Sequence, residues 1–323
     1  MPISKNPIND KDFLAKKTKE GNADLCAKEK VSNNSIDFLI TNPKFTFDDI
    51  VLEKIKLEEI NNAIALFFYK EKVFNEWGLS KVIKQPMNLC VNLFGDPGTG
   101  KTMVANAIAH KLNKKILLVN YAEIESKYVG ETSKNIELLF SKAIESDAVI
   151  LFDEADALLS RRVTDMHNAV DVSVNQTRSV LLSLLDNFEG MVLFTTNFIS
   201  NYDPAFMRRI PFHIKMDLPD EALRIRLLKH YLVSSLPNNV QIENIAKQFD
   251  GISGSDISNA VLSAAIKAAR THSTMVTHDD IEFFLNRALE SKQKNSLNKV
   301  TIEEREVSES YVLSQLCKEK EKC

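Results

Sequence analysis

The chain has 323 residues and a mass of 36.5 kDa, a length that fits about two domains of ordinary size. Hydrophobic residues make up 44% and charged residues 26%, which is typical of a globular protein and excludes a wholly disordered or collagen-like chain. The net charge of -3 disfavours a protein whose main task is to neutralise nucleic-acid phosphates, so no stable nucleic-acid partner is expected. The four cysteines include no CxxC pair and no metal-ligand spacing, which favours reduced cytoplasmic thiols over a zinc site.

The N-terminal segment 1–45 is rich in Lys, Asn and Asp and has few apolar residues. This composition predicts a flexible arm that could carry one short helix. The segment has no apolar core of a signal peptide, and no apolar run of the chain is long enough to span a bilayer. We therefore expect a cytoplasmic protein without a membrane anchor.

The next part of the chain, residues 46–218, alternates between two kinds of apolar pattern. A helical period runs from Leu52 to Phe67, and short β-rich runs follow it at intervals that suit helices. The predicted strands are Leu89–Phe94, Ile116–Val119, Val149–Phe152, Met191–Thr195 and a shorter Phe212–Met216. Repeated β-α units of this kind predict an α/β domain built on a doubly wound, mostly parallel sheet.

After Pro219 the strand signals stop, and the remaining pattern is helical. The predicted helices are Asp220–Ser234, Gln241–Gln248, Ser255–Thr271 and Asp279–Glu290. Thr277 and Asp280 have the spacing of a capping box, with Asp in place of Glu. We expect a small α-helical domain over 219–290 and a charged tail over 291–323, in which Tyr311–Leu316 could form a short helix.

The sharpest chemical signal is the segment GDPGTGKT at residues 95–102, which satisfies the pattern G-x4-G-K-[ST]. It follows a predicted strand and precedes a predicted helix, the setting in which backbone N–H groups at a helix N-terminus hold phosphates. Three of the nine glycines of the chain lie in this loop. Lys101 would reach the β- and γ-phosphates of a nucleotide, and the Thr102 hydroxyl would ligate Mg2+.

The second signal is a pair of acids, Asp153 and Glu154, at the end of a predicted buried strand. Successive strand residues point to opposite sides, so the two carboxylates can have different tasks. Asp153 would hold Mg2+ through its water shell, and Glu154 would orient and polarise the attacking water. The presence of Glu154 favours hydrolysis over mere nucleotide binding.

With these motifs the chain resembles the classical AAA ATPases, from about Phe45 to Leu289. The resemblance implies a P-loop fold with a helical lid, and ATP and Mg2+ as cofactors. It extends to Phe47-Asp-Asp-Ile50, which is similar to the family's adenine-side entry although Val51-Leu52 stands in place of the usual Gly-Gly, and to GISGSD at 251–256. The implied nucleotide contacts are Asp49, Ile50, Pro97, Gly98, Thr99, Gly100, Lys101, Thr102, Met103, Gly254 and Ser255.

Two further elements are interpreted through the same resemblance. Asn197, at the end of the Met191–Thr195 run, corresponds to the sensor-1 Asn that helps to position the lytic water. Arg208 and Arg209 correspond to arginines that act on the nucleotide of the neighbouring subunit. Because an arginine finger stabilises transition-state charge in trans, the resemblance implies a head-to-tail homo-hexamer.

The segment SKYVGE at 126–131 is similar to pore loop 1 of AAA rings. The resemblance implies that Lys127, Tyr128 and Val129 grip a polypeptide, since an aromatic ring contacts varied sequences with little preference. The segment 160–173 would supply a second pore loop.

The sequence thus predicts an ATP-hydrolysing motor that remodels or unfolds a protein by threading it through a central pore. A HORMA-domain protein of a bacterial antiviral defence system is one candidate substrate, in a single-ring, stand-alone type of AAA protein. Filament-severing and complex-disassembly enzymes share the same core motifs. A nucleic-acid-directed loader or helicase and a nucleotide-gated scaffold with negligible turnover are the alternatives from other classes.

Overall fold

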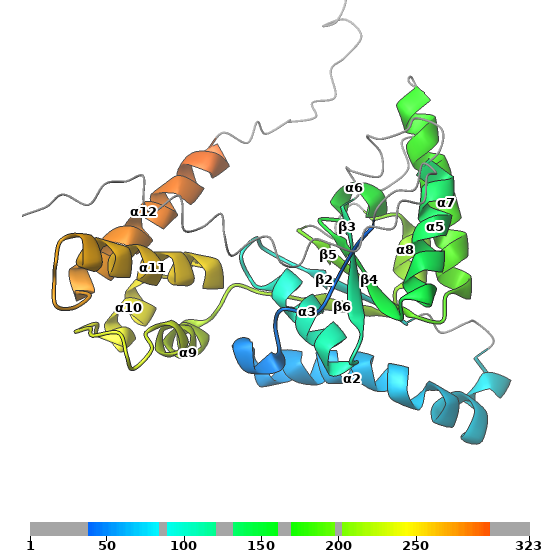
Figure 1. Cartoon of the computed structure of the whole chain (residues 1–323), viewed down its shortest axis with the longest axis horizontal. Coiled ribbons are helices and arrows are strands. Elements are labelled where there is room, and N and C mark those ends of the chain that lie inside the picture. The colour runs from blue at the N-terminus through cyan, green and yellow to red at the C-terminus, as the bar shows by residue number, and fades with distance from the viewer. Residues whose placement is uncertain (1–37, 84–88, 121–131, 161–168, 198–201, 298–323) are drawn as a thin grey trace, which may run out of the picture. The chain divides into compact units, whose positions relative to one another are not determined.

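The computed structural model describes residues 38–83, 89–120, 132–160, 169–197 and 202–297 (Figure 1). The first part, which we call the ATPase module, is a six-stranded sheet with helices on both faces, and the second is a bundle of four helices, which we call the lid. This matches the predicted α/β fold with a C-terminal helical domain. The arm over 1–37, the segment 298–323 and the predicted helix Tyr311–Leu316 lie outside the described residues.

The sheet has the strand order β1-β3-β4-β5-β2-β6, in which every pair except β1–β3 is parallel. The five parallel strands confirm the five runs predicted from the sequence. Their bounds are β2 Leu89–Phe94, β3 Lys115–Asn120, β4 Ala148–Asp153, β5 Met191–Thr196 and β6 Phe212–Lys215. The carboxyl ends of β4, β5 and β2 therefore meet at one edge, where ligands bind to sheets of this type.

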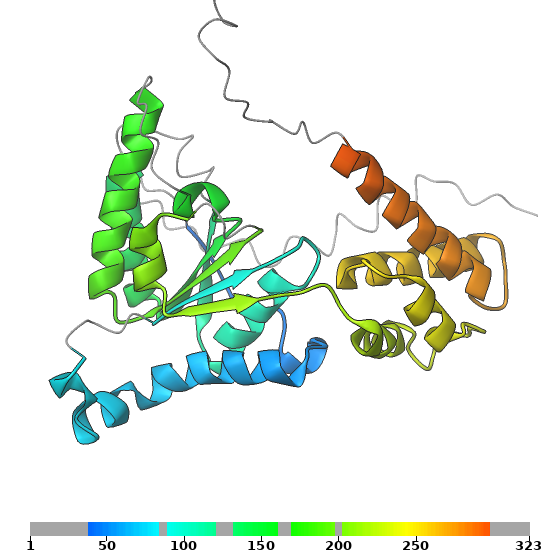
Figure 2. The same cartoon turned by 180° about the vertical axis from the view of Figure 1, so that it is seen from behind.

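Each face of the sheet buries alternate residues of its strands. In β4, Ile150 and Phe152 face one core cluster, whereas Val149 and Leu151 face the other. Phe152 stacks on Phe194 of β5 at 5.2 Å between ring centroids. The first core is covered by α5 (Thr132–Glu145), α7 (Ala169–Asn187) and α8 (Pro204–Arg209), with α6 (Asp156–Leu159) at the strand ends, and the second by α2 (Lys54–Glu71) and α3 (Lys101–Lys111), as Figures 1 and 2 show from opposite sides.

The N-terminal boundary of the sheet differs from the sequence prediction. Residues Leu39–Thr41, expected to be part of the arm, form the strand β1 at the edge of the sheet, antiparallel to β3. Leu39 is 59% exposed, so the strand depends on its pairing with β3 rather than on an apolar pattern that the sequence could reveal. Short helices follow at η1 (Phe47–Asp49), at the π-helix η2 (Lys72–Glu76), which continues α2, and at η3 (Leu79–Lys81).

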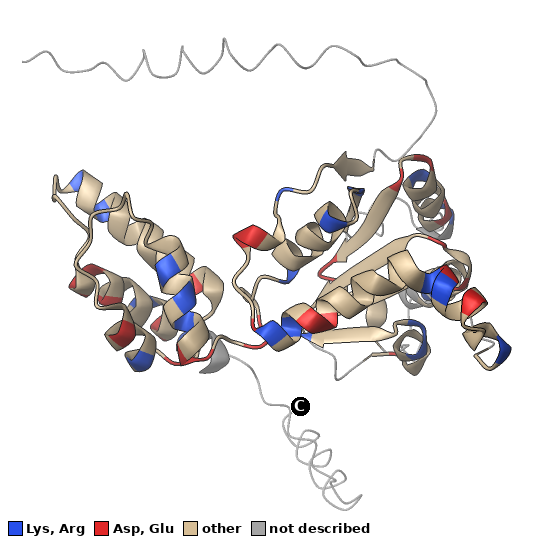
Figure 3. Cartoon of the chain, turned by 90° about the horizontal axis from the view of Figure 1, so that it is seen from below, with Lys and Arg blue, Asp and Glu red and all other residues tan. Residues whose placement is uncertain are grey.

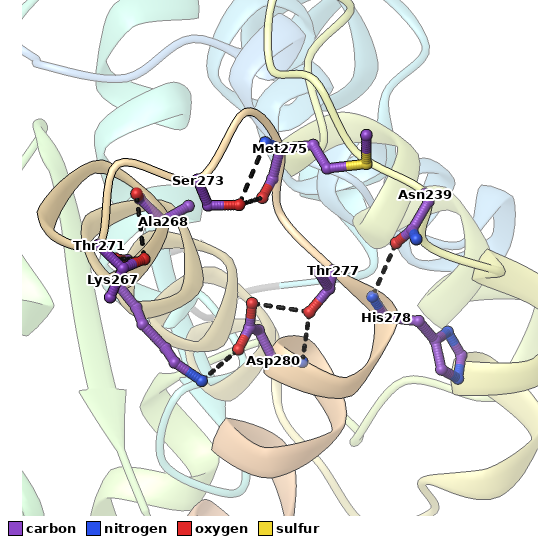
Figure 4. A network of polar contacts seen from close by, with 9 residues as sticks. All are labelled: Asn239, Lys267, Ala268, Thr271, Ser273, Met275, Thr277, His278 and Asp280. Carbon is purple, nitrogen blue, oxygen red and sulfur yellow. Dashed lines mark hydrogen bonds and ion pairs between the residues drawn. The ribbon is translucent and has the colours of Figure 1, made fainter.

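The lid consists of α9 (Glu221–Tyr231), α10 (Ile242–Gln248), α11 (Gly254–Arg270) and α12 (His278–Leu297), which share one apolar core. The predicted cap at Thr277 is confirmed, because the Asp280 backbone N–H donates to Thr277 Oγ1 at 3.2 Å. Figure 4 shows how the loop before α12 is fixed: Lys267 of α11 pairs with Asp280, and the His278 backbone N–H donates to Asn239 Oδ1 at 3.0 Å. These contacts hold the start of α12 to α11 and to the segment before α10.

The last helix of the lid is longer than expected. The sequence predicts its end at Glu290 and a tail from residue 291, but α12 continues to Leu297. Lys292, in this extension, forms an ion pair with Asp256 and approaches the Gly251 carbonyl at 3.4 Å. Lys292 thereby joins the extension to α11, a contact that no local pattern reveals.

Charged residues of both signs lie on the helices of the ATPase module and of the lid (Figure 3). Such mixing is consistent with the small net charge of the chain. Within the described residues, no helix combines the length and the apolar character that a bilayer crossing requires.

Candidate active site

The loop 95–102 joins β2 to α3, and its glycines have backbone angles that favour glycine: φ is +141° at Gly95, +80° at Gly98 and +92° at Gly100. Two of them also lie too close to neighbouring atoms for a side chain. A Cβ at Gly95 would overlap the Met216 carbonyl, and a Cβ at Gly98 would lie 2.6 Å from Ser253 Oγ. The loop therefore has this shape because its glycines permit the turn and the close approach of the lid.

Lys101, the first residue of α3, turns its amino group back into the loop. Its Nζ donates to the Gly95 carbonyl at 2.7 Å, to the Asp96 carbonyl at 2.9 Å and to Asn197 Oδ1 at 3.0 Å. Burial lowers the pKa of Lys101, and nearby carboxylates, Asp156 foremost, oppose that shift. An ammonium group that donates to neutral oxygens of the loop and of Asn197 is well placed to take a phosphate as a further partner.

The two predicted metal-site residues lie side by side. Thr102 Oγ1 donates to Asp153 Oδ1 at 3.0 Å, and Thr195 of the adjacent strand β5 also donates to Asp153 Oδ1. This cluster is made of hydroxyl and carboxylate oxygens, the ligand type that Mg2+ prefers.

Glu154 follows directly and has a strained backbone, with φ at +54°. Its N–H donates to Thr195 Oγ1 at 3.0 Å, and the next N–H, of Ala155, donates to the Thr195 carbonyl at 2.9 Å. Thr195 therefore holds the turn after β4 in a conformation that β4 alone would not select. The exposed Glu154 side chain lies in the wall of the cavity described below.

Asn197 comes directly after β5 and connects two parts of the site. Its side chain accepts from Lys101, while its backbone N–H donates to Asp156 Oδ1 at 3.0 Å. The sequence analysis gives no role to Asp156, although it lies in the same acidic run as Asp153. A helix turn after β4 brings this third acid to the end of the neighbouring strand.

These residues surround one cavity of about 390 Å3. Every predicted nucleotide contact lines it, together with Asp153, Glu154 and Asn197. The sequence analysis missed further lining residues, namely Val51, Thr195, Thr196, Leu227, His230, Tyr231 and Ser258. Thr195 and Thr196 could have been found, because they directly precede Asn197 at a strand end, but the three α9 residues carry only a helical pattern.

The lid side of the cavity is joined to the loop by a backbone hydrogen bond beside a helix cap. The Ser255 N–H donates to the Gly98 carbonyl at 3.1 Å, and Ser253 caps α11 in a capping box with Asp256. On the opposite side, Asp49 lines the cavity but its carboxylate accepts from the Thr46 N–H at 2.7 Å and Oγ1 at 2.9 Å, which lowers the pKa of Asp49. The Asp49 carboxylate thus shapes the chain before α2.

The two predicted arginines have different surroundings. Arg209 donates to Asp186 of α7 through Nε and Nη2, both at 2.9 Å. Arg208 is exposed, and it makes no hydrogen bond or ion pair with the described residues. Both lie in the last turn of α8, which Asp203 caps at its start. The residues predicted to grip a polypeptide, Lys127, Tyr128 and Val129, lie outside the described residues, as does most of the predicted second pore loop.

Comparison with known proteins gives two family matches. Residues 91–218 match the model described as the ATPase family associated with various cellular activities (AAA), and residues 239–283 match the AAA+ lid domain. The first match contains the loop, both acids, Asn197 and both arginines, and the second falls within the lid.

Similar proteins come from eukaryotes and archaea. The 26S proteasome regulatory subunit 8 homolog of Saccharomyces cerevisiae is 30% identical over 305 residues, which cover 90% of this chain and 74% of that protein. The homolog of Encephalitozoon cuniculi is 34% identical over 75% of this chain and 62% of its own length. The proteasome-activating nucleotidase of Pyrococcus abyssi is 33% identical over 79% of this chain and 65% of its own length.

Proposed function

Because the chain belongs to the AAA ATPase family, we propose that it is an ATP-driven motor that remodels or unfolds a protein by threading it through a hexameric ring. It is an ATPase with a lid domain of the same family. The observation that carries the proposal is the cavity at the sheet edge, which gathers the phosphate loop, two oxygen ligands and an exposed carboxylate.

The binding half of the cycle is assigned to the loop and the lid. Backbone N–H groups of 95–102 and the Lys101 ammonium hold the phosphates, and Ile50, Val51 and the α9 residues enclose the base. The Thr102 and Asp153 oxygens, 3.0 Å apart, fit a magnesium site. When bound there, Mg2+ would neutralise charge on the β- and γ-phosphates.

The hydrolytic half is assigned to Glu154 and Asn197. Glu154 accepts a proton from the attacking water as general base, and the strained turn held by Thr195 aims its carboxylate. Asn197 positions that water and contacts the γ-phosphate. Its amide oxygen accepts a hydrogen bond from Lys101, which connects Asn197 to the phosphate loop.

Assembly is assigned to α8, the helix that carries Arg208 and Arg209, which we call the arginine helix. Arg208 is exposed, so it is available to a second copy of the chain, whereas Arg209 is committed to Asp186 within its own chain. We therefore assign the role of the trans-acting finger to Arg208 and a supporting role to Arg209. A finger supplied in trans requires a heterologous interface, which a homo-hexameric ring closes.

The substrate class is supported by the names of the relatives and by the sequence of the pore segment. Relatives named as proteasome regulatory subunits and as a proteasome-activating nucleotidase favour a protein substrate over a nucleic acid. Lys127, Tyr128 and Val129 are proposed to grip that substrate. Within this class, a HORMA-domain protein of bacterial defence and a filament or stable complex are specific candidate substrates, and both rest on the sequence resemblance alone.

The experiment that tests this function captures the substrate. The Glu154→Gln variant should bind ATP without hydrolysing it and retain its substrate in the ring, so that a pull-down with ATP and mass spectrometry identifies a protein. The control carries Tyr128→Ala in addition, and a nuclease-treated sample accompanies both. Capture that depends on Tyr128 and survives nuclease supports the motor. Recovery of DNA or RNA that nuclease abolishes supports the loader or helicase class instead.

A further inference from the structure

A cluster of four polar side chains, three of them buried and the fourth partly buried, extends from the wall of the cavity at Thr196 toward α8. It consists of Asn92 in β2, Thr196 in β5, Tyr202 before α8 and His213 in β6. Asn92 is 0%, Thr196 1% and Tyr202 5% exposed. Because polar groups lose hydration when buried, a cluster this deep is stable only if its members satisfy one another. We call it the Asn92 network.

The hydrogen bonds of the Asn92 network have one consistent direction. Asn92 Nδ2 donates to the Tyr202 hydroxyl at 3.5 Å, Tyr202 donates to Thr196 Oγ1, and Thr196 donates back to Asn92 Oδ1 at 3.4 Å. The second N–H of Asn92 lies 3.4 Å from His213 Nδ1. Since the amide nitrogen can only donate, His213 accepts at Nδ1 and carries its proton on Nε2.

His213 places the outer end of the network against α8. Burial lowers the pKa of His213, whereas backbone groups of Met207 and Ile210, at the end of α8, oppose that shift. The ring is therefore held neutral, in the form that accepts from Asn92. The His213 Nε2 atom is buried and has no hydrogen-bond partner among the described residues. The ring therefore makes its hydrogen bond to Asn92 and packs against α8 without a further one.

The network connects the nucleotide site of a subunit to α8, the helix that carries Arg208 of the same subunit. Thr196 directly precedes Asn197, which contacts Lys101 in the phosphate loop. Tyr202 directly precedes Asp203, the N-cap of the helix that carries Arg208. One closed set of hydrogen bonds thus joins the strand end beside the phosphate to the base of the arginine helix.

We propose that Asn92, Tyr202 and His213 are positioning residues that set the arginine helix according to the state of the active site in the same subunit. A γ-phosphate contacted by Asn197 would fix the end of β5, and the network would carry that placement through Thr196 and Tyr202 to α8. Apolar residues could fill the same space, but only directed hydrogen bonds fix a single relative placement. The inference rests on the proposed function, because the network is proposed to act by placing Arg208, the trans-acting finger.

The test is the Tyr202→Phe variant, which removes one hydroxyl and keeps the ring. In the assembled protein, we expect kcat for ATP to fall about ten-fold or more with KM within about two-fold of the wild type, because misplacing a catalytic group costs turnover rather than ground-state binding. In the Arg208→Ala background the same change should cost nothing further, since the group that it positions is already absent. Thr177→Val, which removes a fully buried hydroxyl from α7 outside the network, is the control and should leave kcat unchanged.

The results separate this inference from the function on which it rests. Suppose that Arg208→Ala lowers turnover and that Tyr202→Phe lowers kcat by the same factor in the Arg208→Ala background as in the wild type. The network then does not act through Arg208, and the inference is wrong while the proposed motor function is unaffected. If Arg208→Ala leaves turnover unchanged, the trans-acting finger and the network fall together. A variant with a lower melting temperature and an unaltered kcat would make Tyr202 merely structural. Should Tyr202→Phe fail to fold, His213→Leu, which removes only the outermost hydrogen bond, takes its place.

Discussion

Arg209 and Asp186 form a two-point ion pair, with the Nε–Oδ1 and Nη2–Oδ2 distances both 2.9 Å, that fastens the end of α8 to the last turn of α7. Arg208, the preceding residue, is exposed and is not part of this pair. Adjacent residues of a helix point in different directions, about 100° apart. Two arginines that look equivalent in the sequence therefore serve different surfaces.

This difference predicts opposite phenotypes for the two arginines. Arg208→Ala should lower ATP turnover of the assembled protein by about 10^3-fold, the scale of a lost arginine finger, and leave the melting temperature unchanged. Arg209→Ala should lower the melting temperature. The loss in the free energy of unfolding should be less than about 1 kcal/mol, because the ion pair is partly exposed, and turnover should fall less than in Arg208→Ala. Arg209→Lys, which keeps the charge but not the two-point geometry, is the matched control. Full turnover by Arg208→Ala in a verified ring would contradict the assignment.

Lys101→Ala should abolish ATP binding measured by isothermal titration calorimetry. The lysine is the one cationic side chain in the predicted phosphate loop, and its amino group is held at that loop by the Gly95 and Asp96 carbonyls. Lys111→Ala is the control, because that lysine lies at the far end of α3 and donates to Asn61. An unchanged ATP affinity in Lys101→Ala would refute the site.

Gly98→Ala should destabilise the protein more than Gly251→Ala, as measured by thermal unfolding. Both glycines have positive φ, +80° and +74°, so each substitution introduces a similar backbone strain of about 1 to 2 kcal/mol. The new Cβ at residue 98 also overlaps the Ser253 and Ser255 hydroxyls, whereas nothing lies within 4 Å of one at residue 251. Equal losses would mean that the lid does not press against the loop in solution.

Asp256→Asn should reduce the loss of stability at low pH. Burial by itself would raise the pKa of Asp256, but hydrogen bonds from Lys292 and Ser253 outweigh it and lower the pKa below its ordinary value of 3.8. The carboxylate therefore contributes stability that is fully present above about pH 3.8 and is lost as the pH falls through the lower native pKa. Urea unfolding at a series of acidic pH values measures this slope. An identical slope in Asp256→Asn and wild type would show that the ion pair with Lys292 does not form.

Tyr128→Ala should leave basal ATP turnover within about two-fold of the wild type and abolish remodelling of a captured substrate. The residue is proposed to grip the polypeptide, and no step of nucleotide binding or hydrolysis is assigned to it, so we expect hydrolysis to proceed without it. Coupled assays of turnover and substrate unfolding on the same preparation provide the measurement. Remodelling at the wild-type rate would remove the threading role of the segment 126–131.

Much of this site was predictable from the sequence because its signals are local. The phosphate loop needs glycines at fixed spacing between a strand and a helix, and Asp153, Glu154 and Asn197 follow directly on apolar strands. The alternation of Val149, Ile150, Leu151 and Phe152 between two faces follows from the period of a strand. For these residues, a short local sequence pattern is sufficient to predict a place in the wall of the cavity.

Other features depended on partners that are distant in the chain. Asp186 and Arg209 are separated by 23 positions, and Asn92 and Tyr202 by 110. Nothing in either local pattern marks the pair. The same holds for β1, which pairs with β3, and for the end of α12, where Lys292 contacts Asp256. The sequence alone determined the five parallel strands and the predicted nucleotide contacts that line the cavity, because backbone periodicity and loop geometry are local. Only the tertiary structure decided which arginine faces outward and which side chains link β5 to α8, because those contacts depend on how distant elements pack.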